Sequence, residues 1–129
     1  MGVKRRLLLD TNVILDYCDA ARAEHGVTCR FIQHAVERAT PLLVTVGSLK
    51  DAYYVLRRLY ASEPLARQVV GRLIEGPLTV IDLKAPYARA ALDSDEPDFE
   101  DGLVRTAAEA EGVFAIITRD ACALSLIHI

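Results

Sequence analysis

The sequence predicts an α/β fold: a three-layer sandwich with a mostly parallel sheet of four to five strands flanked by helices. Four short apolar runs rich in Leu, Val and Ile have the composition of strands that are buried on both faces. Helical patterns lie between these runs, so the connections are crossovers of the kind that join parallel strands. A chain of 129 residues, 52% of them hydrophobic, is long enough for one packed domain over residues 1–129.

The expected strands are brief, and each is bounded by Gly, Pro or charged residues. They cover residues 7–9, 42–46, 78–81 and 114–118. Helices are expected over residues 48–61, 62–76 and 98–112. The second begins at the capping residue Ser62 and ends at Gly76, while the third begins with acidic residues, which the helix dipole favours there. The first has one apolar stripe, formed by Leu49, Ala52, Tyr53, Leu56 and Leu59.

Charge and cysteine content exclude several classes of function. The net charge is −3, from 15 basic and 18 acidic residues, which argues against a strongly cationic nucleic-acid clamp but leaves room for local basic patches. The three cysteines and three histidines form no CxxC or HxxxH pair, so a disulfide framework or a zinc site is not expected. No segment has the length of a membrane span or the h-region of a signal peptide, and we expect a cytoplasmic protein.

Carboxylates distant in sequence are predicted to meet at one edge of the sheet. Asp10 ends the first strand and Asp120 follows the fourth, while Asp51 lies in the first turn of the helix after the second strand. Asp98 and Asp101 open the helix that leads into the fourth strand. Functional groups of parallel α/β sheets gather at the carboxyl ends of the strands. Each acid alone is equally explained as a helix cap or a turn residue, so the joint placement carries the prediction.

Several carboxylates held together repel one another, and a hard divalent cation removes that repulsion. Mg²⁺ or Mn²⁺ prefers oxygen ligands, and either ion can ionise a bound water and stabilise charge on a phosphodiester. Other acids are expected to be solvated: Asp16 on a helix surface, and Asp93, Asp95, Glu96 and Glu100 on a loop and a helix face.

Four segments, "LLLDTNVILD", "SLKDAYYVLRRL", "DFEDGLVRTAAEAEG" and "AIITRD", resemble in order and spacing the acidic motifs of the PIN domain, the fold of VapC-type toxins. The resemblance implies a Mg²⁺- or Mn²⁺-dependent ribonuclease, typically the toxin of a toxin–antitoxin system, with an antitoxin partner and a homodimeric state. By the same resemblance, the catalytic and metal-binding acids are Asp10, Asp51, Asp101 and Asp120. Supporting polar groups are Asn12, Ser48, Asp98 and Thr118.

The sequence departs from the family pattern in two places. Many PIN domains have Glu where this chain has Asp51, which shortens the reach of that carboxylate by one methylene. After Asp120 the family continues through a polar loop to a fifth strand, whereas this sequence has "ACALSLIHI". Two explanations stay open for the part after about residue 121: "LSLIHI" forms a shortened strand, or the segment is truncated.

Basic residues suggest where an RNA strand could bind. Arg57, Arg58, Arg67 and Arg72 lie on two successive expected helices, and Arg119 precedes Asp120, so these side chains could form a rim that contacts phosphates. The same helices could self-associate or leave a groove for an antitoxin helix. A catalytically silent PIN-like module that binds nucleic acid or protein is the alternative function. A haloacid-dehalogenase-type phosphotransferase is disfavoured, because Asn12 stands where that chemistry needs a second Asp.

Overall fold

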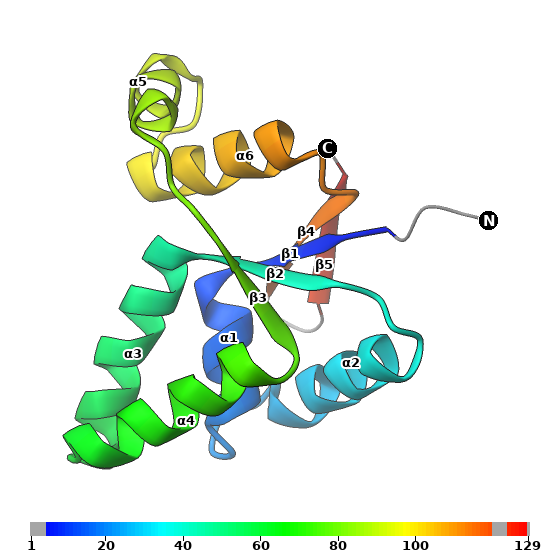
Figure 1. Ribbon diagram of the computed structural model, residues 1–129, viewed down its shortest axis with the longest axis vertical. Coiled ribbons are helices and arrows are strands. Elements are labelled where there is room, and N and C mark those ends of the chain that lie inside the picture. Colours follow the sequence, from blue (N-terminus) through cyan, green and yellow to red (C-terminus); the bar gives the residue numbers. More distant parts are fainter. Residues whose placement is uncertain (1–4, 120–123, 129) are drawn as a thin grey trace.

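The computed structural model describes residues 5–119 and 124–128, and within them a central sheet lies between two layers of helices (Figure 1). The strand order is β3-β2-β1-β4-β5, and the first four strands of this order are parallel. β5 runs antiparallel to β4. The predicted fold class is therefore confirmed. The strands are β1 (Leu7–Leu9), β2 (Leu42–Thr45), β3 (Leu78–Ile81), β4 (Ala115–Arg119) and β5 (Leu124–His128).

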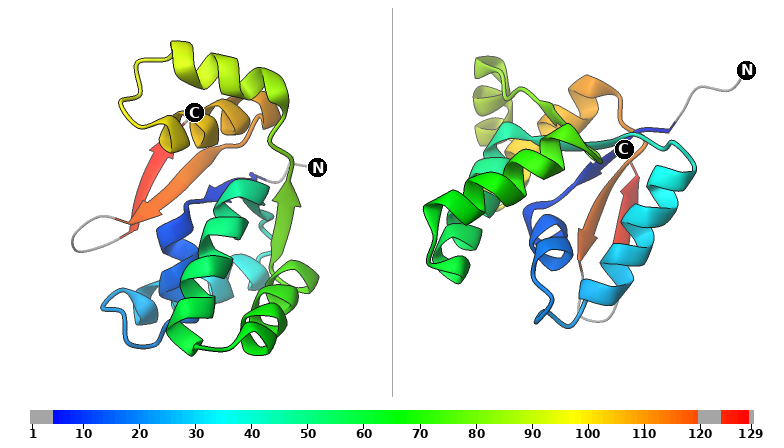
Figure 2. Two further views of the ribbon diagram at one scale, coloured as in Figure 1. Left: turned by 90° about the vertical axis from the view of Figure 1, so that its left-hand side faces the viewer. Right: turned by 60° about the horizontal axis from the view of Figure 1, so that its bottom comes forward.

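Two groups of helices cover opposite faces of the sheet (Figure 2). One face carries α1 (Thr11–Cys18), α2 (His25–Glu37), α3 (Val46–Tyr60) and α4 (Glu63–Glu75); the other carries α5 (Ala85–Asp93) and α6 (Phe99–Glu111). None of the helices in the described part of the chain is long and apolar enough to cross a membrane.

The core has two parts because successive strand residues point to opposite faces of the sheet. Leu9 packs with Val13 and Leu56 under the four-helix layer. Its neighbour Leu8 packs with Ala107 under α5 and α6. The side chains of Leu8 and Leu9 are almost fully shielded from solvent, as expected for a parallel strand covered on both faces.

The register between β1 and β4 determines where the first acidic residue lies. Leu9 is paired with Ile117 in the parallel ladder. The N–H of the next residue, Asp10, donates to the carbonyl oxygen of Ile117 at 3.0 Å. Asp10 and Thr118 are therefore neighbours at the carboxyl ends of two adjacent central strands.

The bounds of the expected elements agree with the sequence prediction to within two residues, and α3 begins two residues earlier than expected. The Thr45 hydroxyl caps it by accepting from the N–H of Ser48 at 3.0 Å. Asp51 consequently lies in the second turn of α3, and the prediction of a first-turn position is wrong. The side chain of Asp51 still reaches the same edge of the sheet, as described below.

Two helices were not anticipated. α2 buries only Thr28, Ile32 and Ala35, a narrow stripe of mixed polarity that hydrophobic periodicity does not detect. α5 has nine residues and buries only Tyr87 and Ala91. The strand expected from "LSLIHI" is observed, because residues 124–128 form β5; truncation of this segment stays a prediction.

Candidate active site

Asp10 occupies the point where β1 ends and α1 begins. Its backbone is extended, and its carboxylate accepts a hydrogen bond from the N–H of Thr11 at 2.8 Å, which fixes the side chain as the cap of α1. Burial raises the pKa of this carboxyl group above its ordinary value, and the Thr11 hydrogen bond offsets part of that rise. Asp10 therefore both caps a helix and faces a cavity.

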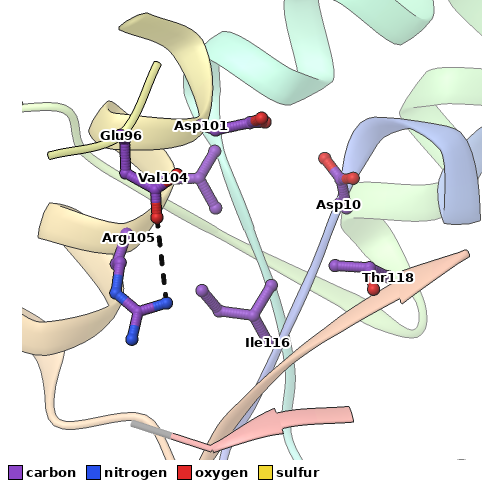
Figure 3. Close-up of a pocket in the computed structure, with 7 residues that line it drawn as sticks. All are labelled: Asp10, Glu96, Asp101, Val104, Arg105, Ile116 and Thr118. Atoms are coloured by element: carbon purple, nitrogen blue, oxygen red, sulfur yellow. Dashed lines mark ion pairs between the residues drawn. The ribbon is translucent and has the colours of Figure 1, made fainter. Parts of the chain in front are cut away.

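That cavity has a volume of about 270 Å³ and lies between the ends of β1 and β4 and the start of α6. Figure 3 shows the carboxyl groups of Asp10 and Asp101 pointing toward one another across it. The guanidinium of Arg105 lies on the far side, where it is 4.0 Å from the carboxylate of Glu96. The cavity is lined by Asp10, Glu96, Asp101, Val104, Arg105, Ile116 and Thr118.

Asp101 is held in place by the first turn of α6. The Asp98 carboxylate caps this helix and accepts from the backbone N–H of Asp101 at 3.0 Å. The pKa of Asp101 is raised by partial burial and then by the negative charges of Asp98, Asp10 and Glu96. The acids of β1 and α6 are thus close enough to interact electrostatically, as their predicted convergence requires.

Asp51 lines a neighbouring cavity of about 300 Å³ that shares Val104 with the first. Lys50 lies 3.3 Å from its carboxylate. Glu100 lies against Asp51. A side-chain hydrogen bond with Asp51, then burial and the charges of Asp51, Asp98 and Asp10, raise the pKa of Glu100 to about 7, while the pKa of Asp51 is lowered.

The donor set of these cavities fits a hard cation. It consists of carboxylate and hydroxyl oxygens, contributed by Asp10, Asp101, Asp51 and Thr118. Among residues 5–119 and 124–128, no three His, Cys, Asp or Glu side chains form a compact group that could hold a metal ion. Asp120 lies outside the described residues.

The four supporting residues take different positions. Asp98 caps α6, and Thr118 lines the cavity beside Asp10. Ser48 is buried and lines the second cavity with Asp51. Asn12 is exposed in the first turn of α1. The functional roles assigned to these side chains remain predictions.

Asp16 is not solvated, and its interpretation as a surface helix residue is wrong. Its side chain is 0% exposed and lies 3.5 Å from the Arg22 guanidinium and 3.3 Å from that of Arg119. Arg119 also pairs with Glu24 at 3.4 Å. Two arginines, one of them from the distant strand β4, neutralise this carboxylate, and helix periodicity on α1 alone could not reveal either partner.

The arginines expected to bind RNA do not surround the acidic cavities evenly. Arg57 and Arg58 lie in the last turn of α3, six and seven residues after Asp51, which is about 9–10 Å along the helix axis. Arg57 and Arg67 pair with Glu63 at 2.8 Å and 3.3 Å, and Arg119 pairs with Asp16 and Glu24. Three of the five arginines therefore already have acidic partners. Their contact with RNA remains a prediction.

Glu96 and Glu100 are the residues that sequence reasoning missed. Both were assigned to a solvated loop and helix face, yet Glu96 lines the acidic cavity and Glu100 contacts Asp51. Glu100 is adjacent to Asp101 in the first turn of α6, and that proximity is the only signal the sequence contains. Its contact depends on how the start of α6 approaches α3, which no local pattern specifies.

A comparison with family models decides the classification. The PIN domain model matches residues 6–121, nearly the whole chain. The chain belongs to the PIN-domain family. Among curated proteins, none matches it.

Solved PIN-like structures share the fold. VapC20 of Mycobacterium tuberculosis, described as a toxin that cleaves the sarcin–ricin loop, is 17% identical with a TM-score of 0.70, over 89% of this chain and 90% of that one. A toxin–antitoxin complex from Klebsiella pneumoniae contains a chain that is 18% identical with a TM-score of 0.61, over 88% of this PIN domain and 86% of that chain.

Proposed function

We propose that this PIN domain is a Mg²⁺- or Mn²⁺-dependent endoribonuclease and the toxin of a VapBC-type toxin–antitoxin pair. The observation that carries the proposal is the common cavity of Asp10 and Asp101, which come from β1 and α6 and face one another at the carboxyl edge of a parallel sheet. The fold shared with a named RNA-cleaving toxin supports the substrate class. The likeness to a toxin–antitoxin complex supports an antitoxin partner.

In this proposal Asp10 and Asp101 hold the cation, and Asp51 and Asp120 complete the acidic set. A bound Mg²⁺ or Mn²⁺ supplies a Lewis acid that activates water and stabilises the charge of the phosphodiester. The Thr11 N–H fixes the Asp10 carboxylate, and the Asp98 cap fixes the backbone at Asp101, so both residues are positioned before the substrate binds.

Two further side chains lie beside this acidic set. Glu100 contacts Asp51 at the edge of the site, and Thr118 adds a hydroxyl group beside Asp10.

Digestion of a mixed RNA pool tests the proposal. Wild-type protein should cleave with Mn²⁺ or Mg²⁺ and not with EDTA, while Asp10→Asn and Asp101→Asn should each abolish cleavage and retain the wild-type circular dichroism spectrum. Asp93→Asn is the matched control, because Asp93 is an exposed acid of α5 that pairs with Arg89, away from the acidic cavity. Robust cleavage by purified Asp10→Asn would refute the metal role.

A silent PIN-like binding module is the second candidate. The lack of a compact three-ligand group among the described side chains favours it. Such a module would bind RNA or protein without Mn²⁺-dependent cleavage, so the digestion and a parallel binding assay separate the two. A homodimeric state and a cytoplasmic location belong to the same proposal and are checked by size-exclusion chromatography with light scattering and by cell fractionation.

A further inference from the structure

A second cavity opens beside the acidic one and differs from it in character. Its volume is about 300 Å³, and it shares Val104 with the acidic cavity, so the two are adjacent across one side chain. We call it the Phe99 hollow. It is lined by Thr45, Gly47, Ser48, Lys50, Asp51, Leu83, Phe99, Glu100, Leu103 and Val104.

Part of the lining of the Phe99 hollow is apolar. Phe99 is the first residue of α6 and is 46% exposed, and Leu103 follows one helical turn later on the same face of the helix. Leu83, from the connection between β3 and α5, also lines the hollow. It packs closely against Gly47, because a Cβ at this position would lie 2.8 Å from Cδ1 of Leu83.

The lining also carries hydrogen-bonding groups. The Lys50 ammonium lies 3.3 Å from the Asp51 carboxylate, and Glu100 contacts the same Asp51. Apolar side chains, one of them aromatic, and hydrogen-bonding groups therefore line the same cavity. A single exposed Phe is ordinary, but a concave site with a few convergent polar groups is the usual form of a ligand-binding pocket.

The ligand that matches this mixed lining is flat, aromatic and polar along its edge. A nucleobase has these properties: its face can stack on Phe99 and its edge can bond to Lys50 or Glu100. We propose that the Phe99 hollow binds one unpaired base of an RNA strand, next to the phosphodiester held at the Asp10–Asp101 cavity. This inference rests on the proposed ribonuclease function and adds a base-binding subsite to it.

Two substitutions at Phe99 separate the effect of ring stacking from that of an apolar side chain without a ring. Phe99→Leu keeps an apolar side chain and loses the flat ring, whereas Phe99→Tyr keeps the ring. Leu92→Ala is the control, because Leu92 is 60% exposed on α5 and does not line the hollow. Circular dichroism and thermal melting establish that all three variants fold.

The first measurement is the affinity for short, fluorescently labelled single-stranded oligoribonucleotides in EDTA, by anisotropy. The second is kcat and KM for the same oligonucleotides with Mn²⁺. Phe99→Leu should raise both Kd and KM about tenfold, as expected for loss of a stacked base, and leave kcat nearly unchanged. Phe99→Tyr and Leu92→Ala should match the wild type.

An abasic substitution tests whether a base is the partner. Each oligonucleotide position is replaced in turn by an abasic residue, and at the position that fills the hollow the wild type and Phe99→Leu should bind equally. Unchanged Kd and KM in Phe99→Leu, with normal Mn²⁺-dependent cleavage, would overturn the subsite and leave the ribonuclease intact. RNA binding weakened by Phe99→Leu without any cleavage would support the subsite and reject the ribonuclease. If the wild type neither binds nor cleaves RNA, both the ribonuclease function and the base-binding subsite are refuted.

Discussion

Replacing Asp16 with asparagine removes the charge of a carboxylate that the fold buries completely between two guanidinium groups. Breaking a buried ion pair by removing one partner costs about 3–5 kcal/mol. Here the loss is smaller, because Arg22 keeps Asp19 at 3.5 Å and Arg119 keeps Glu24 at 3.4 Å. The asparagine oxygen can also still accept a hydrogen bond. We therefore expect the free energy of unfolding to fall by about 2–3 kcal/mol.

This loss converts into a change in melting temperature. An unfolding entropy of about 2.1 cal/mol/K per residue over 129 residues amounts to about 0.27 kcal/mol/K, so Tm should fall by about 7–11 °C. Differential scanning calorimetry in EDTA is the assay. Asp93→Asn, which removes the exposed partner of Arg89, should shift Tm by less than about 2 °C. A similarly small shift for Asp16→Asn would show that the buried pairs do not stabilise the protein.

The same variant separates stability from catalysis. Asp16 does not line the acidic cavity, so Asp16→Asn should retain more RNA cleavage than Asp10→Asn when both are assayed well below their melting temperatures. An equal loss of cleavage in the two variants would mean that Asp16 belongs to the catalytic set.

The remaining predictions concern the start of α6 and the buried ion pairs. Because the pKa of Glu100 is raised to about 7, its proton stabilises the folded state below pH 4.5, and this contribution is lost as pH rises through 7; the lowered pKa of Asp51 acts only at more acidic pH. Glu100→Gln should therefore flatten the fall in the free energy of unfolding between pH 4.5 and 7.5 in EDTA by about 1 kcal/mol at most, since solvent screens the Glu100–Asp51 pair. Thermal unfolding across this pH range is the measurement, and an unaltered pH profile would contradict the raised pKa of Glu100. Asp98→Ala removes the cap of α6 and should be about 1 kcal/mol less stable in urea unfolding than Asp98→Asn, which keeps a capping oxygen; equal stability would contradict the cap. Arg119→Ala combined with Asp16→Asn should destabilise the protein less than the sum of the single changes, and strict additivity would exclude the contact between them.

The sheet could be predicted from sequence because its strands are short, apolar and covered on both faces. Leu7–Leu9 and Leu78–Ile81 are observed with the expected bounds. The helices with capping signals, such as α4 after Ser62, were also found to within a residue. α2 and α5 were not, because their stability comes from tertiary packing of small or mixed stripes rather than from a local pattern.

For the candidate site, topology predicted which acids approach one another but not their contacts. A position at a strand end was enough to bring Asp10 to the same cavity as Asp101. The pairing of Glu100 with Asp51 and the burial of Asp16 beside Arg119 depend on how helices and a distant strand are placed in space. Such contacts join residues far apart in sequence, and no spacing rule along one element encodes them.

Direct measurement of Mn²⁺ binding by electron paramagnetic resonance or isothermal titration calorimetry tests the central claim, that the Asp10 and Asp101 carboxylates together hold a divalent cation. The wild type and Asp93→Asn should bind Mn²⁺ equally, whereas Asp10→Asn and Asp101→Asn should each lose most of the affinity while remaining folded. Undiminished Mn²⁺ binding by both site variants would contradict the proposal that Asp10 and Asp101 hold the cation.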